Sequence, residues 1–257
     1  MGKGSQIVDP SDAVHAFRTF IDALPADAFV PFFFGEDEEL SFHRGAWDFA
    51  AHVASIVMPH LRCTGIALDV GCGAGRLLVP AARHFRTVIG VDLHTRHDLV
   101  MTHLRRRGAS NAVYVPFDGF ALPVRNACVD LVYSIYVLTY AGDLTVLRTL
   151  FEECARVLRP DGLALIYFGV RSGLATDRQG WLWDLADRAR EHVPPWNRPV
   201  AWAAPVNEKN LAIPLRVAVR LADHAGLQIL ANGRSRRLFA PAHWAGQRYL
   251  LLRRLAR

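Results

Sequence analysis

The fold follows from one stretch of sequence, Ala67-Leu68-Asp69-Val70-Gly71-Cys72-Gly73-Ala74-Gly75-Arg76. An apolar run with an acid near its end is followed by three glycines at alternate positions and then by the start of a helical pattern. This order predicts a buried strand, a tight turn and a helix. Because glycine has no side chain, such a turn lets a ligand approach the backbone, and a helix start offers N–H groups and partial positive charge.

Segments of strand and helix character alternate along the rest of the chain. Strands are predicted at residues 66–70, 87–91, 112–115, 130–134 and 163–168, and helices at 76–84, 98–107 and 143–158, the last capped by Asp143 and ended by a turn at 159–162. Strands joined by helices of this length need crossover connections, so the class is α/β with a doubly wound, mostly parallel sheet. Residues 227–231 and 247–252 are predicted to add an antiparallel pair at one edge, giving seven strands.

Two regions lie outside this alternation. Residues 1–62 contain apolar positions at helical spacing from Ala13 to Leu24 and a second helical segment at 45–61, and are predicted to form an N-terminal helical cap. The main domain is then 63–257. Within it, residues 169–210 carry four of the six tryptophans and four prolines, which predicts an insertion over the carboxyl ends of the strands, before a helix at 211–225.

The composition is that of an ordinary globular protein. The 257 residues are 51% hydrophobic and 21% charged, enough for one sizeable core. Neither a secretory leader nor an apolar run of about 18 residues is present, so secretion and membrane spanning are not expected. The four cysteines include no Cys-x-x-Cys pair, which predicts neither a zinc site nor a disulfide framework, and a cytoplasmic location is expected.

The net charge of +6 comes from the end of the chain. Seven arginines and no acid follow Ala231, which leaves the first 230 residues with one net negative charge. The arginines flank apolar, strand-like segments, where they are expected at strand ends or edges as solubilising charges rather than as an RNA-binding patch. Nucleic acid is therefore not the expected partner.

Two further acidic motifs follow the glycine run. Asp92 ends a predicted strand 17 residues after Gly75, where its carboxylate can accept hydrogen bonds from both hydroxyls of a ribose. The second motif is Asp118-Gly119-Phe120-Ala121-Leu122-Pro123, shortly before the strand at 130–134. Taken singly, each acid has an ordinary reading as a helix cap, a strand end or an Asx turn.

In order and spacing, the motifs from Ile66 to Gly169 resemble those of the class I S-adenosylmethionine-dependent methyltransferases, in particular the type 11 and type 25 domains. The run Gly-x-Gly-x-Gly differs from the Gly-x-Gly-x-x-Gly of dinucleotide enzymes, which disfavours an NAD-dependent oxidoreductase. The resemblance implies a Rossmann-like fold, S-adenosyl-L-methionine as cofactor and S-adenosyl-L-homocysteine as product.

The resemblance also implies a set of cofactor residues. Asp69, Gly71, Cys72, Gly73 and Gly75 are expected to bind the methionine part and the ribose side of the cofactor. Asp92 and Leu93 are expected to bind the ribose, and Asp118, Gly119 and Phe120 the adenine. Ser134 is expected to lie beside the sulfur. Arg44 is a candidate for the carboxylate of the cofactor. No metal is indicated.

Methyl transfer from a sulfonium is an in-line displacement in which the protein mainly aligns the reacting atoms. A hydroxyl or amine acceptor still has to lose a proton, and candidates for the base are His43, Tyr136 and Tyr140. Many related enzymes have a histidine near the position of Tyr140, and this chain does not. The base therefore remains open.

The acceptor is expected to be a small molecule, methylated on oxygen or nitrogen. The segment Ser134-Ile135-Tyr136-Val137 lacks the Asn/Asp-Pro-Pro-Tyr/Phe run of amino-directed nucleic-acid methyltransferases, and there is no Pro-Cys pair for attack on a pyrimidine. The aromatic and proline-rich segments suit a small, partly apolar molecule. Methylation of a protein or RNA, and a non-catalytic cofactor-binding role, stay as alternatives, and the sequence does not fix the oligomeric state.

Overall fold

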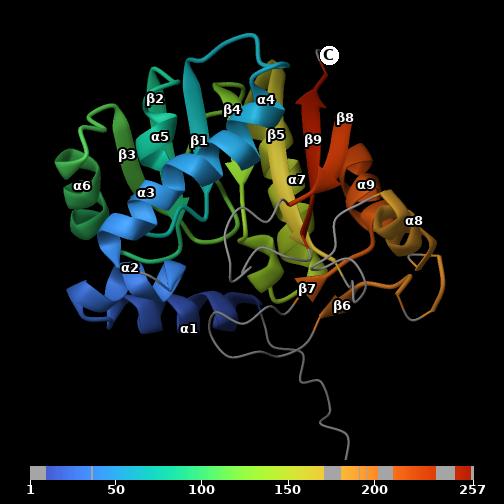
Figure 1. Cartoon of the computed structure of the whole chain (residues 1–257), viewed down its shortest axis with the longest axis horizontal. Helices are drawn as coiled ribbons and strands as arrows, with labels where there is room; N and C mark the ends of the chain where they lie inside the picture. Colours follow the sequence, from blue (N-terminus) through green and yellow to red (C-terminus); the bar gives the residue numbers. More distant parts are fainter. Residues whose placement is uncertain are drawn as a thin grey trace, which may run out of the picture.

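A seven-stranded sheet forms the centre of the computed structural model (Figure 1). The structure describes residues 10–35, 37–170, 181–190, 192–194, 196–201, 211–235 and 247–255. The strands are β1 Ile66–Val70, β2 Thr87–Asp92, β3 Ala112–Pro116, β4 Val129–Ser134, β5 Leu158–Gly169, β8 Leu227–Arg234 and β9 Gln247–Arg254, in the order β3-β2-β1-β4-β5-β9-β8. Two short strands, β6 Val200–Ala201 and β7 Leu211–Ala212, pair separately.

The predicted doubly wound α/β class is confirmed. Strands β1 to β5 pair in parallel, whereas β9 runs antiparallel to both β5 and β8, as predicted for the last two strands. The strand order reverses at β1, which has β2 on one side and β4 on the other. Such a reversal leaves a crevice at the carboxyl ends of the strands, where open α/β sheets bind their ligands.

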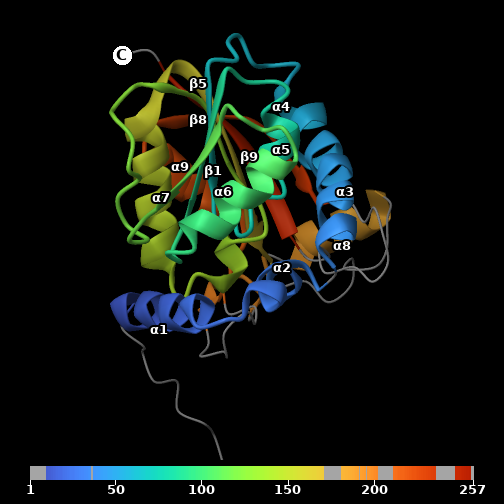
Figure 2. The ribbon, with the colours of Figure 1, turned by 90° about the vertical axis from the view of Figure 1, so that its left-hand side faces the viewer.

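Helices cover both faces of the sheet (Figure 2). On one face lie α7 Leu144–Val157 and α9 Leu215–His224; on the other lie α3 Glu38–Phe49, the π-helical turn η1 Ala50–Ala54, α4 Ser55–Val57, α5 Leu78–Ala81 and α6 His97–Arg106. Two further helical segments, α8 Trp181–Arg190 and the 3-10 turn η2 Leu138–Tyr140, connect strands of the structure. None of the helices in the described part of the chain is long and apolar enough to cross a membrane.

The N-terminal helices α1 Pro10–Asp22 and α2 Ala26–Phe34 lie across the carboxyl end of the sheet (Figures 1 and 2). Arg18 holds α1 there, since its Nε donates to the carbonyl of Leu93 at 2.6 Å and its Nη2 to that of Phe117 at 2.9 Å. Both acceptors belong to loops that follow strands of the sheet. The predicted N-terminal cap is therefore helical, and its division from the main domain at residue 62 stays a prediction.

Several predicted elements have different bounds in the structure. The helix predicted at 76–84 shrinks to α5, four residues around Pro80, because proline lacks the N–H that a longer helix needs. The helix predicted at 211–225 starts at Leu215, after Pro214 as N-cap. The segment 159–162, predicted as a turn, belongs to β5, where Asp161 has a φ of 63° and the pairing with β4 shifts register.

The part of the cap that follows α1 also differs from its prediction. Residues 26–34 form α2 despite Pro31, and the predicted helix at 45–61 starts earlier, at Glu38, and continues through the π-helical turn to α4. Half of the predicted insertion at 169–210 lies outside the described residues; its described parts are α8, β6 and short connections.

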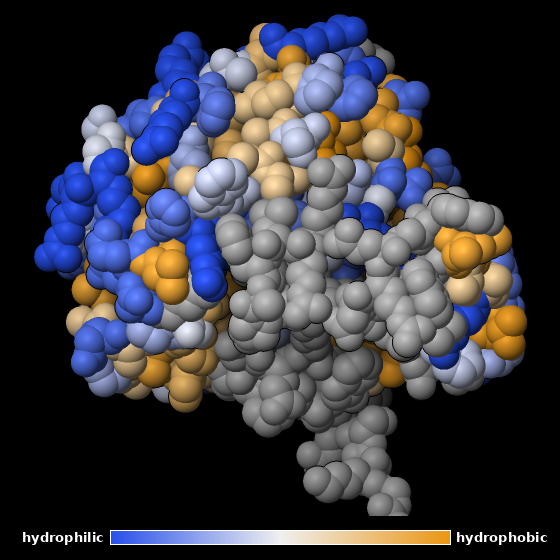
Figure 3. Space-filling view, in the orientation of Figure 1, coloured by the Kyte–Doolittle hydropathy of each residue, from blue (hydrophilic) through white to orange (hydrophobic). Residues whose placement is uncertain are grey.

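The arginines are not all solubilising charges. Arg248, the second residue of β9, lies at a strand end as expected, but it is buried at 1% exposure and is therefore not a solubilising charge. Hydrophilic residues do gather over α6, at the left of Figure 3. Next to this helix, however, Arg107 pairs with Glu38 at 2.9 Å and with Glu39 at 2.7 Å. Its charge is therefore matched within the protein rather than left to bind a polyanion.

The predicted cap of α7 gives the first testable expectation. Asp143 Oδ1 accepts from the backbone N–H of Thr145 at 2.6 Å and of Val146 at 3.2 Å. Asp143→Ala should lower the free energy of unfolding by about 1 kcal/mol, a fall in Tm of roughly 2–4 °C in differential scanning calorimetry. Glu152→Ala, at an exposed position of the same helix, should leave Tm nearly unchanged. An equal Tm for wild type and Asp143→Ala would contradict the capping role.

Candidate functional site

The glycine loop between β1 and α5 has a backbone that side chains would strain. Gly71 and Gly73 have φ values of +80° and +54°. A Cβ on Gly71 would lie 2.2 Å from Val137 Cγ2, and one on Gly73 would lie 3.1 Å from Phe33 Cδ1. The loop therefore has glycine both for its conformation and because neighbouring side chains approach it closely.

The N–H groups of this loop are already used inside the protein. Those of Gly71 and Cys72 donate to the carbonyl of Val91, at 2.8 and 3.1 Å, and that of Gly75 donates to the carbonyl of Cys72 at 2.9 Å. In addition, α5 begins only at Leu78 and has one turn. The expectation that the loop offers free donors and a helix N-terminus to a ligand is therefore wrong for these groups.

Asp92 fastens the loop to β2. Its Oδ2 accepts from the N–H of Gly73 at 2.7 Å, and its Oδ1 accepts from the N–H of Leu93 at 2.7 Å. The residue is 6% exposed. Because each carboxylate oxygen has two lone pairs, the side chain can accept one more hydrogen bond on each oxygen, as two ribose hydroxyls require.

Asp69 is a buried acid whose charge is not fully matched. It is 2% exposed, and its Oδ2 forms no hydrogen bond of normal geometry with the residues that the structure describes, although the buried hydroxyl of Tyr133 lies near enough to stabilise its charge. Burial, followed by repulsion from Asp92, raises the pKa of Asp69 well above its usual range. The same surroundings raise the pKa of the Cys72 thiol, so Cys72 is an unreactive neighbour of the loop.

A buried ion pair joins the loop to α3. Arg76 Nη1 lies 2.9 Å from Asp48 Oδ2, with both side chains buried, and the guanidinium lies 4.4 Å from the ring centre of Phe34. A Cβ on Gly45 would lie 2.8 Å from the carbonyl oxygen of Arg76, so the helix and the loop are in close contact. Arg44 precedes Gly45 in α3, and its positive charge acts to lower the pKa of Asp48, which burial raises.

The residues predicted to bind adenine lie beside those predicted to bind ribose. Asp118 Oδ1 accepts from the N–H groups of Phe120 and Ala121, at 2.8 and 2.9 Å, which is an Asx turn. A Cβ on Gly119 would lie 3.2 Å from Leu93 Cδ2. The loops after β2 and β3 therefore meet, and Phe120, at 38% exposure, keeps part of its ring on the surface.

The segment after β4 places two of the candidate bases. Ser134 is bound to the end of β1, since its Oγ donates to the carbonyl of Val70 at 2.9 Å. Tyr136, two residues on, has a φ of +66°, which is strained for an aromatic residue. Burial raises the pKa of Tyr136 well above its usual range and also raises the pKa of Tyr140, so both phenols keep their protons at neutral pH.

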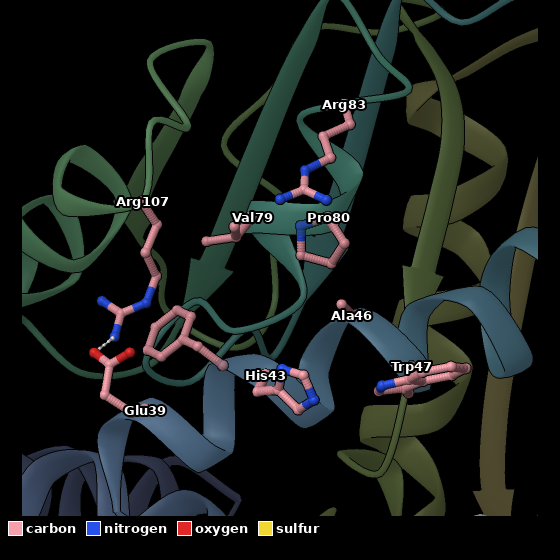
Figure 4. A pocket seen from close by; sticks show the side chains of 9 residues that line it. Glu39, His43, Ala46, Trp47, Val79, Pro80, Arg83 and Arg107 are labelled. Carbon is pink, nitrogen blue, oxygen red and sulfur yellow. Dashed lines mark hydrogen bonds and ion pairs between the residues drawn. The ribbon is translucent and has the colours of Figure 1, made fainter.

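His43, the third candidate base, lies elsewhere. It lines a groove of about 410 Å³ between α3, α5 and α6, together with Trp47 and Arg83 (Figure 4). None of the residues that line this groove belongs to the predicted cofactor set. Because no residue of the glycine loop or of the ends of β2 and β4 lines this groove, His43 is separated from the other predicted site residues except its chain neighbour Arg44.

Two buried histidines near the site were not predicted. His94 is fully buried next to the glycine loop, and His52, in η1, has its ring edge-on to those of Tyr136 and Tyr167, with centroids 5.9 and 6.0 Å apart. The only sequence signal for His94 is its position two residues after Asp92. His52 has no such signal, because its neighbours are brought together only by the fold.

Comparison with known proteins agrees with the geometry. The model of the methyltransferase-domain family matches residues 68–166. A curated protein named ubiquinone biosynthesis O-methyltransferase, from Rhizobium etli, is 30% identical over 100 residues, which are 38% of this chain and 39% of that protein. The protein of the same name from Bartonella tribocorum is 28% identical over 131 residues, which are 50% of this chain and 48% of that protein. This chain thus matches less than half of each relative.

Solved structures agree on the fold. A SAM-dependent methyltransferase from Methanosarcina mazei has a TM-score of 0.58 at 17% identity, covering 79% of this chain and 98% of its own. The [4+2]-cyclase SpnF has the same TM-score and identity, covering 81% of this chain and 82% of its own. Residues 68–166 are therefore a methyltransferase domain of the class I S-adenosylmethionine-dependent family, whose cofactor is S-adenosylmethionine.

Proposed function

We propose that this chain is a methyltransferase that uses S-adenosylmethionine to methylate a hydroxyl group of a small molecule. The observation that carries the proposal is the pair of buried carboxylates beside the glycine loop, Asp69 and Asp92. Burial, and after it repulsion from Asp92, raises the pKa of Asp69, and the nearby Arg76 is already paired with Asp48. The site therefore favours a ligand with positive charge.

This charge distinguishes the two classes of adenosine cofactor. The pyrophosphate of NAD is an anion that needs backbone donors and a helix N-terminus. Here the N–H groups of Gly71, Cys72, Gly73 and Gly75 all donate within the protein, and α5 is only four residues long. The sulfonium and ammonium groups of S-adenosylmethionine are cations instead, and suit unmatched carboxylates.

The residues fit the cofactor in the following arrangement. Asp69, with its unpaired Oδ2, would accept from the ammonium group, and Asp92 from the ribose hydroxyls. The adenine would lie near Leu93 and Gly119, with Asp118 at its edge. Ser134 and Val137 would flank the sulfur, since they contact the end of β1 and the first glycine.

When bound, S-adenosylmethionine supplies an electrophilic methyl group on a sulfur that departs as a thioether. The protein has to align the acceptor oxygen with it and keep water away. Tyr136 and Tyr140 keep their protons, so they can donate a hydrogen bond to the acceptor but are poor bases. This favours an acceptor whose hydroxyl ionises near neutral pH, such as an acidic phenol. The name of the curated relatives, ubiquinone biosynthesis O-methyltransferase, supports O-methylation.

The cofactor proposal is tested by thermal shift. S-adenosylhomocysteine at 100 times its Kd should add about 2.7 kcal/mol to the free energy of unfolding, and NADH should add nothing. Asp92→Ala should abolish the rise in Tm, because the loop loses the hydrogen bond from the Gly73 N–H to the Asp92 carboxylate. Asp98→Ala, at an exposed position of α6, should keep it. A rise in Tm with NADH alone would overturn the proposal.

The role of Asp69 predicts a pH dependence. The pKa of Asp69 is raised in the folded, cofactor-free protein, and a cation favours its ionised form, so affinity for S-adenosylhomocysteine should fall as the pH falls. Titration calorimetry in two buffers of different ionisation enthalpy should detect proton release on binding. Asp69→Asn should abolish both effects and weaken binding about tenfold, the loss of roughly one charge-assisted hydrogen bond.

The same variant should be more stable than wild type at neutral pH. A raised pKa in the folded state means that unfolding releases a proton, so the free energy of unfolding decreases as the pH rises from the ordinary pKa of an aspartate toward the raised one. Because Asp69→Asn removes the ionisable group, the free energy of unfolding no longer decreases in this way, and Tm at pH 7 should rise by a few degrees. A lower Tm for Asp69→Asn at pH 7, with no change in the pH profile of binding, would contradict this account.

The acceptor class is tested with methyl-labelled cofactor. Transfer to acidic phenols should exceed transfer to aliphatic alcohols, and its rate should rise with pH through the pKa of each phenol. Total RNA and a panel of proteins serve as the comparison. Label in RNA or protein but not in phenols would favour those acceptors, and cofactor binding without any transfer would favour a non-catalytic role.

A further inference from the structure

We propose that His94 is a positioning residue that couples the two N-terminal helices to the glycine loop, so that closure of α1 and α2 sets the shape of the cofactor site. The inference rests on the proposed cofactor site. His94 is fully buried, and it follows Asp92 by two residues in the loop after β2. It contacts the glycine loop on one side and α2 on the other.

Toward the loop, the imidazole binds a glycine carbonyl. Its Nε2 lies 3.2 Å from the carbonyl oxygen of Gly73, and its Nδ1 lies 3.3 Å from the backbone nitrogen of Arg96. Because the N–H of Arg96 can only donate, Nδ1 accepts and Nε2 carries the proton that is donated to Gly73. Burial lowers the pKa of His94, which keeps the ring in this neutral form.

The backbone of Gly73 is thereby held at both its N–H and its carbonyl. Asp92 binds its N–H at 2.7 Å, and His94 binds its carbonyl. Tyr114 holds the imidazole in turn: the two rings stack with centroids 4.9 Å apart at 9°, and the Tyr114 hydroxyl donates to the carbonyl of His94 at 2.6 Å. The ring therefore has little freedom to move without moving Gly73.

Toward the helices, the same ring is the surface on which α2 packs. Phe29 meets it edge-on at 5.2 Å between centroids, and Phe33 lies at 5.7 Å. Phe33 also approaches Gly73 directly, at 3.1 Å from the place of a Cβ. An outward movement of α2 would remove both rings from His94 and uncover the glycine loop.

The two residues after His94 also bind the N-terminal helices. Thr95 donates to the carboxylate of Asp22 through its N–H at 2.8 Å and its hydroxyl at 2.9 Å. Arg96 Nη1 donates to the carbonyl of Leu24 at 2.6 Å, and to those of Ile21 and Asp22 at longer range. Three consecutive residues thus connect the end of β2 to the helices, and His94 alone of the three also reaches the glycine loop.

Two substitutions separate the contacts of the ring. The amide nitrogen of Gln reaches about as far as Nε2 and can donate to Gly73, whereas the shorter Asn can replace only Nδ1. His94→Gln should bind S-adenosylhomocysteine within about threefold of wild type in titration calorimetry, and His94→Asn should bind it about tenfold more weakly, the effect of one lost hydrogen bond. His103→Asn removes another buried histidine, one paired with Glu38, and should not change binding.

Hydrogen exchange tests the coupling itself. In His94→Asn, amides of residues 14–34 should exchange at least tenfold faster than in wild type, and S-adenosylhomocysteine should no longer slow them, while β4 and β5 stay protected. Phe33→Ala, which leaves the ring of His94 intact, should also speed exchange in α2 and weaken binding. It serves as the second test should His94→Asn not fold.

The outcomes separate this inference from the function on which it rests. If wild type binds S-adenosylhomocysteine, and His94→Asn or Phe33→Ala binds it equally well with unchanged exchange in α2, the coupling is wrong and the cofactor site stands. If wild type binds no S-adenosylhomocysteine, the proposed function fails, and this inference fails with it.

Discussion

The carboxylate of Asp92 is the contact on which the site depends. It connects the end of β2 to the turn after β1, and it does so from a position that is almost free of solvent. A hydrogen bond from an amide to a buried carboxylate is about twice as strong as one between neutral groups. This bond fixes the position of Gly73. The positive φ angles of the loop, the close approach of Phe33 and the hydrogen bond from His94 all depend on that position.

On the proposed function, the same contact also affects which charge of ligand the crevice accepts. Every backbone donor that the loop gives to Asp92 or to the carbonyl of Val91 is lost to an anionic ligand, whereas a cation would favour the ionised form of Asp69. The loop therefore shares a glycine-rich turn with dinucleotide enzymes but differs from theirs both in the spacing of its glycines and in charge. A buried acid without a partner, such as Asp69, costs stability, and such costs concentrate at functional sites.

The sequence predicted what depends on local pattern. Strand β1, the end of β2 and the capped helix α7 follow from apolar runs, glycines and Asp143, and the structure has them within a residue or two. It did not predict α2, because Pro31 indicated a break, although the aromatic residues around it pack on the site. Nor did it predict His94, whose partners Gly73, Tyr114 and Phe29 come from three other elements and meet only in the folded chain.

On the proposed function, the residues that bind the cofactor and those that select the acceptor lie in different parts of the chain. The region shared with the methyltransferase-domain family, residues 68–166, runs from β1 to β5 and contains every predicted cofactor residue except Arg44. The helices α1 to α4 and the segments after β5 lie outside it. On the proposed function, an acceptor would have to fit against α1 and α2, because these two helices lie across the carboxyl end of the sheet. A neighbour of equal similarity is named a cyclase, so the shared fold alone does not determine the reaction.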